Sequence, residues 1–277
     1  SYARSWIRDG AMMAEGLLRV GLAGPARDYL DWYAPYQFEN GKVPCCVDAR
    51  GADPVPENDS HGELIHLAAL VHRYTGDRAT LDRAWPHVEA AARYMESLRQ
   101  SERIAANQTP ERAAYFGLMP PSISHEGYSA RPAYSYWDDF WALRGFEDAV
   151  YLADARGDGA AAARLAAQRD EFSADLFASI AASSARFGVN YIPGAADLGD
   201  FDATSTTIAI APAGQQARLP QALLYATFER YWTNFVARRD GTVASSDYTP
   251  YELRVVGTFV RLGWRARANE ALEFFFR

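Results

Sequence analysis

Residues 136–159 read YWDDFWALRGFEDAVYLADARGDG. Apolar side chains recur at helical spacing over 136–156, and the glycines on either side of Asp158 then interrupt the pattern. A second run of helical periodicity follows over 159–182. Two helices joined by so short a break predict a helical hairpin.

The same arrangement recurs along the whole chain. Helices are expected over 9–20 and 25–38, over 59–74 and 80–99, over 202–211 and 220–238, and over 250–263 and 265–277. Strand signals are few, and only 189–192 is expected as a short strand. The sequence therefore predicts a single all-α domain over 1–277, a toroid or solenoid of hairpins that differ too much to form a repeat of defined period.

Every second helix in this scheme begins at a short acidic motif that often carries aromatic residues. The motifs are Trp6-Ile7-Arg8-Asp9, Glu57-Asn58-Asp59, Tyr136-Trp137-Asp138-Asp139, Asp200-Phe201-Asp202 and Tyr251-Glu252. Alternate helices of stacked hairpins run parallel, so the five motifs are expected at one end of the molecule. The long loops 42–56 and 107–132 are expected on the same side. Carboxylates gathered with aromatic rings in one concavity indicate a sugar site.

The composition indicates a globular protein with an uncharged partner. The 277 residues are 49% apolar and 23% charged, which is ample material for a core. The net charge is −7, from 28 basic and 35 acidic residues, and no long run of like charge marks a surface for nucleic acid or anionic membranes. No apolar stretch approaches the roughly 20 residues that span a bilayer, so no membrane insertion is predicted. Nothing in the sequence indicates an oligomeric state.

Metal and nucleophile chemistry find little support in the sequence. Cys45 and Cys46 are adjacent, which is not the spacing of the separated cysteine pairs that chelate metals or staple loops. His61 and His66 are five residues apart and diverge on a helix, unlike the histidines of a zinc-binding helix. No nucleophile elbow, phosphate-binding glycine loop or nicotinamide fingerprint is present. Neither a metal nor a cofactor is therefore predicted.

An aspartate at a helix start has an ordinary alternative role, because its carboxylate caps the free N–H groups of the first turn. Asp9, Asp59 and Asp202 are all open to that interpretation, and Asp202 fits it best. Capping does not require Trp6 and Arg8 beside Asp9, or a histidine soon after Asp59. A sugar site does use such neighbours, since aromatic rings stack on the apolar sugar face and Arg and Asp bind hydroxyls.

The segment 124–141 holds the acid candidates. Asp138 and Asp139 are adjacent and lie among Trp137, Phe140 and Trp141. Glycosidases need one protonated carboxyl, and an aromatic wall or a neighbouring like charge raises the pKa of a carboxyl. The alternative is that the rings belong to the core and the two aspartates form a solvated helix start.

These motifs resemble those of glucoamylase-like glycoside hydrolases, a group that includes bacterial glycogen-debranching-like proteins. Trp6-Ile7-Arg8-Asp9-Gly10 resembles the Trp-x-Arg-Asp signature of the family, whose Arg and Asp hold the terminal glucose. Trp137-Asp138-Asp139 is similar to the Trp-Glu-Glu, or Trp-Asp in trehalases, that contains the general acid. Residues 57–62 look like the start of another inner helix. The resemblance implies an (α/α)6 toroid with its site above the N-terminal ends of the inner helices.

The sequence departs from the family pattern in two ways. The acid position holds Asp instead of the glucoamylase Glu, and Glu126 in the His-Glu-Gly loop is a rival for the role. The chain offers about five of the six hairpins that the resemblance implies, so an incomplete toroid is expected. Glu252 is the candidate general base late in the chain, and the alternative is a base that lies beyond Arg277.

The prediction is an inverting, exo-acting glycosidase whose partner is an oligosaccharide or glycan, an α-glucoside or a related sugar. The catalytic candidates are Asp138, Asp139, Glu126 and Glu252, and the substrate-binding candidates are Trp6, Arg8, Asp9, Glu57, Asp59, His61, His125, Tyr136 and Trp137. Inversion needs two carboxyl groups about 6.5–9.5 Å apart, with a water between them. Two alternatives stay open: a glycoside phosphorylase with Arg or His near the acid, and a non-catalytic glycan-binding or scaffold toroid. A sugar epimerase needs paired histidines, and the five scattered histidines argue against it.

Overall fold

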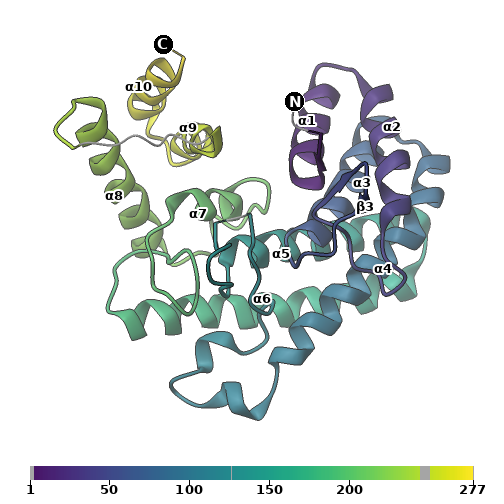
Figure 1. Cartoon of the computed structure of the whole chain (residues 1–277), viewed down its shortest axis with the longest axis horizontal. Coiled ribbons are helices and arrows are strands. Elements are labelled where there is room, and N and C mark those ends of the chain that lie inside the picture. The colour runs from purple at the N-terminus through teal and green to yellow at the C-terminus, as the bar shows by residue number, and fades with distance from the viewer. Residues whose placement is uncertain (1–2, 126, 244–249, 277) are drawn as a thin grey trace.

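The protein is mainly helical, as Figure 1 shows. A computed structural model describes residues 3–125, 127–243 and 250–276. The α-helices in this part of the chain are α1 (Ile7–Arg19), α2 (Ala23–Tyr33), α3 (Ser60–Thr75), α4 (Arg78–Glu102), α5 (Tyr136–Arg156), α6 (Gly159–Phe187), α7 (Ala203–Ile210), α8 (Gln221–Arg239), α9 (Leu253–Arg261) and α10 (Arg265–Phe275). Short 3₁₀ turns are η1 (Ala34–Tyr36), η2 (Ala105–Gln108), η3 (Ala113–Tyr115) and η4 (Pro250–Glu252). The prediction of an all-α protein is confirmed.

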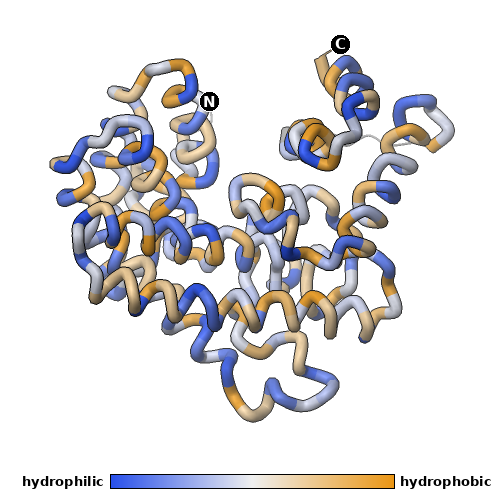
Figure 2. The backbone as a smooth tube through the Cα atoms, turned by 180° about the vertical axis from the view of Figure 1, so that it is seen from behind, coloured by the Kyte–Doolittle hydropathy of each residue, from blue (hydrophilic) through white to orange (hydrophobic). Residues whose placement is uncertain are grey.

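The helices pair in chain order and stack in two rows. α1 contacts α2, α3 contacts α4, α5 contacts α6, α7 contacts α8, and α9 contacts α10. The first members form an inner row, in which α1 packs on α3, α3 on α5, α5 on α7, and α7 on α9, while α2, α4 and α6 follow outside it. The row curves, so that α1 and α9 face each other across its concave side (Figure 1). Hydrophobic and hydrophilic stretches alternate along the helices (Figure 2), because each helix turns one face to the core.

Two of the hairpin turns use the same Gly-Asp pair. α3 and α5 end at Gly76 and Gly157, whose φ angles of +64° and +76° lie in the left-handed region that glycine adopts without strain. The following residues, Asp77 and Asp158, each accept a backbone N–H from the first turn of the next helix. The Gly-Asp dipeptide therefore ends the first helix of each hairpin and caps the second. Because both signals are local, the sequence predicted where these two hairpins turn.

α3 and α5 cross closely at two glycines. A β-carbon on Gly62 would lie 2.1 Å from the carbonyl oxygen of Trp141, and one on Gly145 would lie 2.7 Å from the Cα of Gly62. Further along the crossing, the buried carboxylate of Asp148 on α5 joins the two helices through contacts of 2.5–2.6 Å to Arg73, His66 and Arg144. This crossing forms the middle of the core and holds the starts of both helices in place.

A small antiparallel sheet lies beside the start of α1. Its strands are β1 (Ser5–Trp6), β2 (Cys46–Asp48) and β3 (Gly51–Ala52), in the order β1-β2-β3. Trp6 pairs with Cys46, and Asp48 pairs with Gly51. Strands of two or three residues are too short to produce an alternating pattern, so the sequence did not predict them.

The predicted strand at 189–192 is wrong. These residues follow α6, which runs on to Phe187, and they form an irregular connection. The Ile192 N–H donates to the Thr227 hydroxyl at 2.9 Å, and the Tyr191 carbonyl accepts from Ser184 at 3.2 Å. Burial of a loop between two helices therefore produced the apolar pattern that resembled a strand.

Candidate functional site

The starts of four inner helices meet around Arg8, in the first turn of α1. Arg8 Nη1 donates to Glu57 Oε2 at 3.1 Å and to Asp59 Oδ2 at 3.2 Å, and Arg8 Nε donates to the hydroxyl of Tyr251 at 3.0 Å. Trp137, from the first turn of α5, donates its indole N–H to the same Asp59 oxygen at 2.8 Å. We call Arg8, Glu57, Asp59, Trp137, Asp138 and Tyr251 the Arg8 cluster. The predicted gathering of acidic motifs is confirmed for these four helix starts.

Asp59 stands at the N-cap position of α3 but does not cap the helix. No backbone N–H of the first turn bonds to its side chain, and its Oδ2 instead accepts from Arg8 and Trp137. Asp202 behaves differently, because its carboxylate accepts the Ser205 N–H at 3.1 Å and caps α7. The capping interpretation is therefore wrong for Asp59 and confirmed for Asp202.

The Arg8 cluster combines a permanently charged arginine, Arg8, with two carboxyl groups, Glu57 and Asp138, whose pKa values are raised. Burial lowers the pKa of Arg8, but the charge of Asp59, with smaller effects from other acidic groups nearby, raises it above its ordinary value on balance. Burial, followed by the charge of Asp59, raises the pKa of Glu57 to about 9 although Arg8 opposes the shift. Glu57 is therefore a neutral acid near pH 7. Its Oε1 is buried and has no hydrogen-bond partner among the described residues.

Asp138 faces the cluster from the start of α5. Its carboxylate accepts hydrogen bonds from Ser122 Oγ at 2.5 Å and Ser124 Oγ at 2.7 Å, and only 1% of the residue is exposed. Burial and then the charge of Asp59 raise the pKa of Asp138 to about 8, against the two serine hydroxyls and Arg8. Asp138 therefore holds a proton near neutral pH. Ser124 has a φ of +53°, a left-handed backbone unusual for a residue with a side chain.

The carboxyl of Asp139, the residue after Asp138, contacts the loop before α5 and not the Arg8 cluster. Its Oδ1 accepts the backbone N–H of Met119 at 2.9 Å, in the loop before α5, and the residue is fully buried. Burial raises the pKa of Asp139 well above its ordinary value. Of the two adjacent acids, Asp138 is the one whose pKa responds to Asp59 and Arg8, and Asp139 supports the loop.

The two long loops meet beside these acids, as the sequence predicted. The Ile123 N–H donates to the Pro56 carbonyl at 3.1 Å, and the Asn58 amide donates to the Pro120 carbonyl at 2.9 Å. The contact places Ser122 and Ser124 against Asp138. Neither serine was a predicted site residue, since an isolated serine in a loop carries no periodic signal.

Aromatic rings and a second arginine cover the cluster. The His125 ring stacks on Trp137 with a centroid distance of 4.4 Å, and the Tyr251 ring lies 5.7 Å from Trp137. Arg254 lies over both Trp137 and Tyr251, at 4.9 and 4.6 Å from the ring centroids. His125, Tyr251 and Arg254 are partly exposed, whereas Trp137 is buried. They therefore form the outer side of the cluster, and Trp6, 5.3 Å from the Arg8 guanidinium, borders it near the small sheet.

Tyr136, His61 and Asp9, which were predicted as binding residues, lie apart from the cluster. Tyr136 is buried and its hydroxyl contacts Ser179 of α6 at 2.8 Å. His61 is buried, accepts the Val43 N–H at 3.1 Å and packs against Tyr94, and burial lowers its pKa to about 3. Glu252 is treated below. Asp9 is exposed in the first turn of α1. Glu126 lies outside the described residues.

Glu252 belongs to a second cavity beside the cluster. Its carboxylate accepts from Arg238 at 3.0 and 2.5 Å and from the Tyr231 hydroxyl at 2.7 Å. The cavity, of about 430 Å³, is also lined by Phe201, Asp202, Ala203, Thr204, Asn234, Ala237 and Val243. His125 connects the two regions, since its Nε2 lies 3.8 Å from Asp202 Oδ2. The predicted base is therefore next to the Arg8 cluster but bound to its own arginine.

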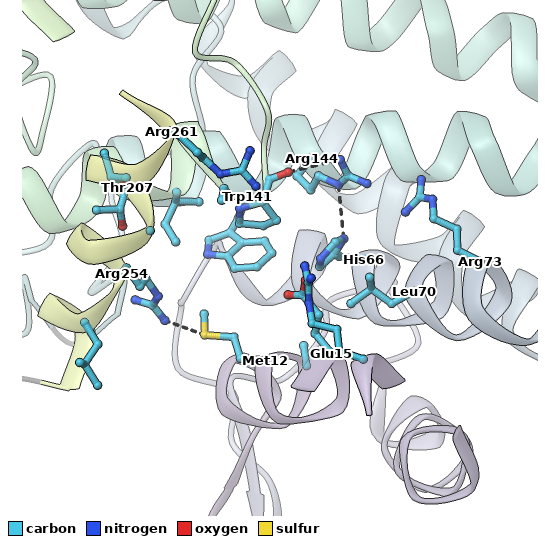
Figure 3. Close-up of a pocket in the computed structure, with 18 residues that line it drawn as sticks. Met12, Glu15, His66, Leu70, Arg73, Trp141, Arg144, Thr207, Arg254 and Arg261 are labelled. Carbon is cyan, nitrogen blue, oxygen red and sulfur yellow. Dashed lines mark hydrogen bonds and ion pairs between the residues drawn. The ribbon is translucent and has the colours of Figure 1, made fainter. Parts of the chain in front are cut away.

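A larger cavity, of about 510 Å³, lies inside the inner row and touches all of its helices (Figure 3). Its lining is rich in arginine, and Arg254, which reaches it from α9, contacts the sulfur of Met12 on α1 at 2.6 Å. Burial lowers the pKa of Arg254 to about 10, so it remains a cation at neutral pH. Its Nη1 has no hydrogen-bond partner among the described residues. Arg254 was not predicted, because a single arginine in an amphipathic helix is usually a solvated side chain.

Comparisons with described protein families, curated proteins and solved structures find no match to this chain. The resemblance to glucoamylase-like enzymes therefore stays a prediction. In the described part of the chain, no helix combines the length and apolar character needed to cross a bilayer.

The chemistry of the site follows from its charges. A carboxyl that is protonated near pH 7 lies beside a fixed cation, a bound carboxylate and flat aromatic faces. Such a group can donate a proton to an oxygen atom, and the neighbours can bind a neutral, hydroxyl-rich ligand.

Proposed function

We propose that the protein is a glycoside hydrolase that binds a terminal sugar at the Arg8 cluster and uses Asp138 as its general acid. The observation that carries this proposal is the environment of Asp138, a carboxyl with a pKa raised to about 8 that lies beside Arg8 and Asp59. A glycosidase needs such a proton donor near the operating pH. The aromatic rings of Trp137, Tyr251 and Trp6 supply faces for the sugar.

We also infer that the inner row belongs to an (α/α)6 toroid. Support comes from the unbroken series of contacts from α1 to α9 and from the concave curvature of that row. Arg8 and Met12 of α1 contact Tyr251 and Arg254 across the concave side, which brings the first and fifth hairpins together. In such a toroid the Arg8 cluster occupies the funnel above the helix starts.

The water-activating base is assigned to Glu252 in this proposal. Glu252 pairs with Arg238 and lines the cavity that adjoins His125 and Asp202. The Glu252→Gln variant should lose activity to the same extent as removal of the acid if Glu252 is the base. Retained activity would transfer the base to another carboxylate and leave the acid assignment intact.

The acid assignment is tested by comparing two adjacent variants. Asp138→Asn removes the proton donor and should lower kcat on α-linked gluco-oligosaccharides by about 10²–10⁴-fold. Asp139→Asn keeps an acceptor for the Met119 N–H and should retain most activity. Sugar release from a panel of α- and β-linked disaccharides gives the rates, and NMR of the first product anomer tests inversion. Equal loss in the two variants would contradict the assignment.

A glycoside phosphorylase is a second candidate, because the cation of Arg254 lies over Trp137, the residue before Asp138. Arg254 and His125 both contact Trp137, next to Asp138 in the chain, and Arg8 completes a cationic surround. Phosphate ions bind such groups. Measuring sugar release with and without inorganic phosphate separates the two enzymes: a phosphorylase forms a sugar phosphate only with phosphate, whereas a hydrolase is indifferent to it.

The burial of the acids favours a third possibility, a non-catalytic glycan-binding or scaffold protein. Asp59 and Asp139 have no exposed surface, and Asp138 has 1%. Glycan binding measured by calorimetry, without turnover on any substrate of the panel, would favour this alternative over both enzymes.

A further inference from the structure

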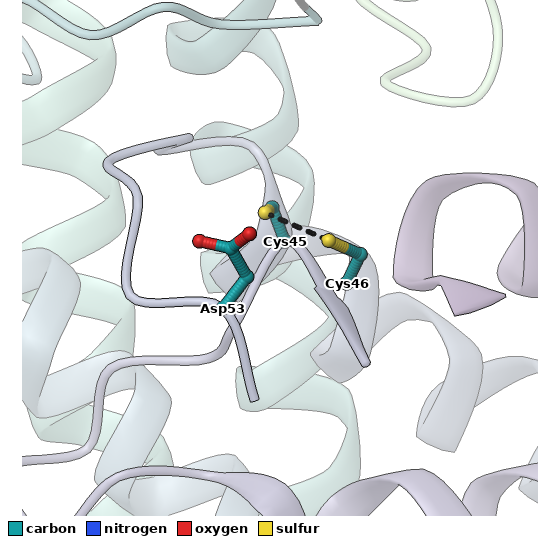
Figure 4. A group of neighbouring side chains, drawn as sticks. All are labelled: Cys45, Cys46 and Asp53. Carbon is teal, nitrogen blue, oxygen red and sulfur yellow. Dashed lines mark hydrogen bonds between the residues drawn. The ribbon is translucent and has the colours of Figure 1, made fainter. Parts of the chain in front are cut away.

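Two thiols and a carboxylate converge beside the small sheet. Cys45 and Cys46 have their sulfur atoms 3.4 Å apart, and Asp53 brings a carboxylate oxygen so that the three ligand atoms lie within 4.8 Å of one another (Figure 4). Both cysteines are free and 1% exposed, and Asp53 is partly exposed. The group therefore has a buried sulfur side and a more open carboxylate side.

The main chain positions all three residues. Cys46 pairs with Trp6 across β1 and β2, and the carbonyl of Cys45 accepts the Ile7 N–H at 3.1 Å. The carbonyl of Cys46 accepts the Asp53 N–H at 3.0 Å, which holds Asp53 beside the thiols. Successive residues of a regular strand point to opposite faces, but β2 begins only at Cys46, so the two sulfur atoms can converge. The pairing of β1 with β2 and the Cys46–Asp53 backbone hydrogen bond thus bring the two sulfur atoms and the carboxylate together, which the spacing of the cysteines in the sequence did not indicate.

The contacts of the three side chains are compatible with metal ligation. Asp53 Oδ1 accepts the Val55 N–H at 3.1 Å, and Asp53 Oδ2 lies 3.9 Å from Arg4 Nη1. The sulfur atoms contact each other, and the apolar neighbours Trp6 and Val55 pack around them. Lys42 and Arg4 lie within electrostatic reach of the cysteines, so part of the negative charge of two thiolates and a carboxylate is balanced locally.

We propose that Cys45, Cys46 and Asp53 bind a thiophilic divalent cation, with Zn²⁺ as the ordinary candidate. Thiolates select Zn²⁺ and similar soft ions over Mg²⁺ and Ca²⁺, which prefer oxygen ligands. Two sulfur atoms on a tetrahedral zinc, each at about 2.3 Å, are about 3.8 Å apart. The observed 3.4 Å needs only small side-chain rotations to reach that separation. Solvent on the Asp53 side can complete the coordination.

The bound ion would stabilise one edge of the Arg8 cluster. It would tie residues 45–53 together at the point where Trp6 and Ile7 pair with the same segment, immediately before Arg8. The segment continues through Val55 to Glu57, whose carboxyl binds Arg8. The role is structural, and the inference stands whether or not the protein is a glycosidase.

Cadmium titration of the reduced, tag-free protein tests the site directly. Thiolate coordination of Cd²⁺ produces an ultraviolet charge-transfer absorption, which should saturate at one equivalent per chain, and Zn²⁺ should displace it. Binding should also raise the Tm, since an ion bound only by the folded state stabilises it.

Matched variants assign the ligands. Cys45→Ser with Cys46→Ser should abolish the absorption, and Asp53→Asn should weaken Cd²⁺ binding by about tenfold or more. Asp48→Asn is the control, because Asp48 lies on the same sheet but binds Arg50 and Arg4. Circular dichroism checks that each variant keeps its helices.

Three outcomes would overturn the proposal: no sulfur-to-cadmium absorption in the folded, reduced parent protein, unchanged absorption in the double cysteine variant, or equal weakening by Asp48→Asn and Asp53→Asn. The first of these is independent of whether any variant folds.

Discussion

Asp138 and Asp139 are chain neighbours and are buried to the same degree, but their surroundings differ. Successive helical residues point about 100° apart, so the Asp138 carboxyl faces the Arg8 cluster while the Asp139 carboxyl accepts the backbone N–H of Met119 in the loop. Two serines of the preceding loop orient Asp138 through short hydrogen bonds. At the residue scale, partners that are distant in sequence thus decide which of the two carboxyls faces the Arg8 cluster.

Asp138 should make the protein less stable as the pH rises from about 4 to about 8. Its ordinary pKa is about 3.9, and burial with the charge of Asp59 raises it to about 8 in the folded protein. Between these values the native state retains a proton that the unfolded state has released. The contribution is complete below about pH 4 and is lost through pH 8, so the free energy of unfolding falls by up to ~1.4 kcal/mol per pH unit from this group.

Urea denaturation at pH 5, 6, 7 and 8 measures this dependence. Asp138→Asn should show a shallower fall than the parent protein, and Asp28→Asn, which changes an exposed carboxylate on α2, should follow the parent. Parallel curves for the parent and Asp138→Asn would show that the carboxyl is ionised in the folded state.

At the scale of elements, the α3–α5 crossing decides where the site residues lie. Gly62 and Gly145 let the two backbones approach closely, and the Asp148 ion pairs hold them there. Asp59 precedes α3 and Trp137 lies in the first turn of α5, so the distance between the helices sets the hydrogen bond between those side chains. Glycine in the interior of a helix is normally unfavourable, and this close packing explains why Gly145 lies in the middle of α5.

Gly62→Ala should destabilise the protein by about 1–3 kcal/mol or more, because the new β-carbon would lie 2.1 Å from the Trp141 carbonyl oxygen. Gly16→Ala is the matched control in α1, where no atom lies within 4 Å of the added carbon. That change should stabilise by roughly 0.5–1 kcal/mol through helix propensity. Thermal denaturation compares the two, and a neutral Gly62→Ala would contradict the close crossing.

At the scale of the whole molecule, the inner row is packed unevenly. α3 lies between α1 and α5 in the middle of the row, whereas α9 packs on α7 and α10 at its end. The hydrogen bond from Arg8 to Tyr251 joins that end back to the first hairpin. Elements with few buried contacts open more readily than the core.

Hydrogen exchange should therefore be slowest in α3 and α5 and fastest among the inner helices in α9. Tyr251→Phe removes the hydroxyl that accepts from Arg8, so exchange in α9 should become faster while α3 and α5 remain as before. Tyr225→Phe, on the exposed side of α8, is the control. Unchanged exchange of α9 in Tyr251→Phe would show that the bridge contributes nothing to the position of the fifth hairpin.

Much of the secondary structure could be predicted because its signals are local. Helical periodicity, the Gly76-Asp77 turn and its counterpart at Gly157 each act within a few residues, and the helices of the structure follow the predicted segments closely. The short strands were missed and 189–192 was misassigned, because pairing and burial there depend on other segments. The gathering of acidic helix starts was also predictable, since it follows from the alternation of hairpins.

The sequence by itself determined the all-α class, the hairpin order and the acidic motifs at the helix starts, because periodicity and capping are properties of neighbouring residues. Only the tertiary structure decided which of those acids face one another. Arg8 binds Glu57 and Asp59. Ser122 and Ser124 donate hydrogen bonds to Asp138 and not to Asp139, and Arg238 pairs with Glu252. Charge, desolvation and hydrogen bonding depend on atoms a few ångströms apart in space, whatever their distance along the chain.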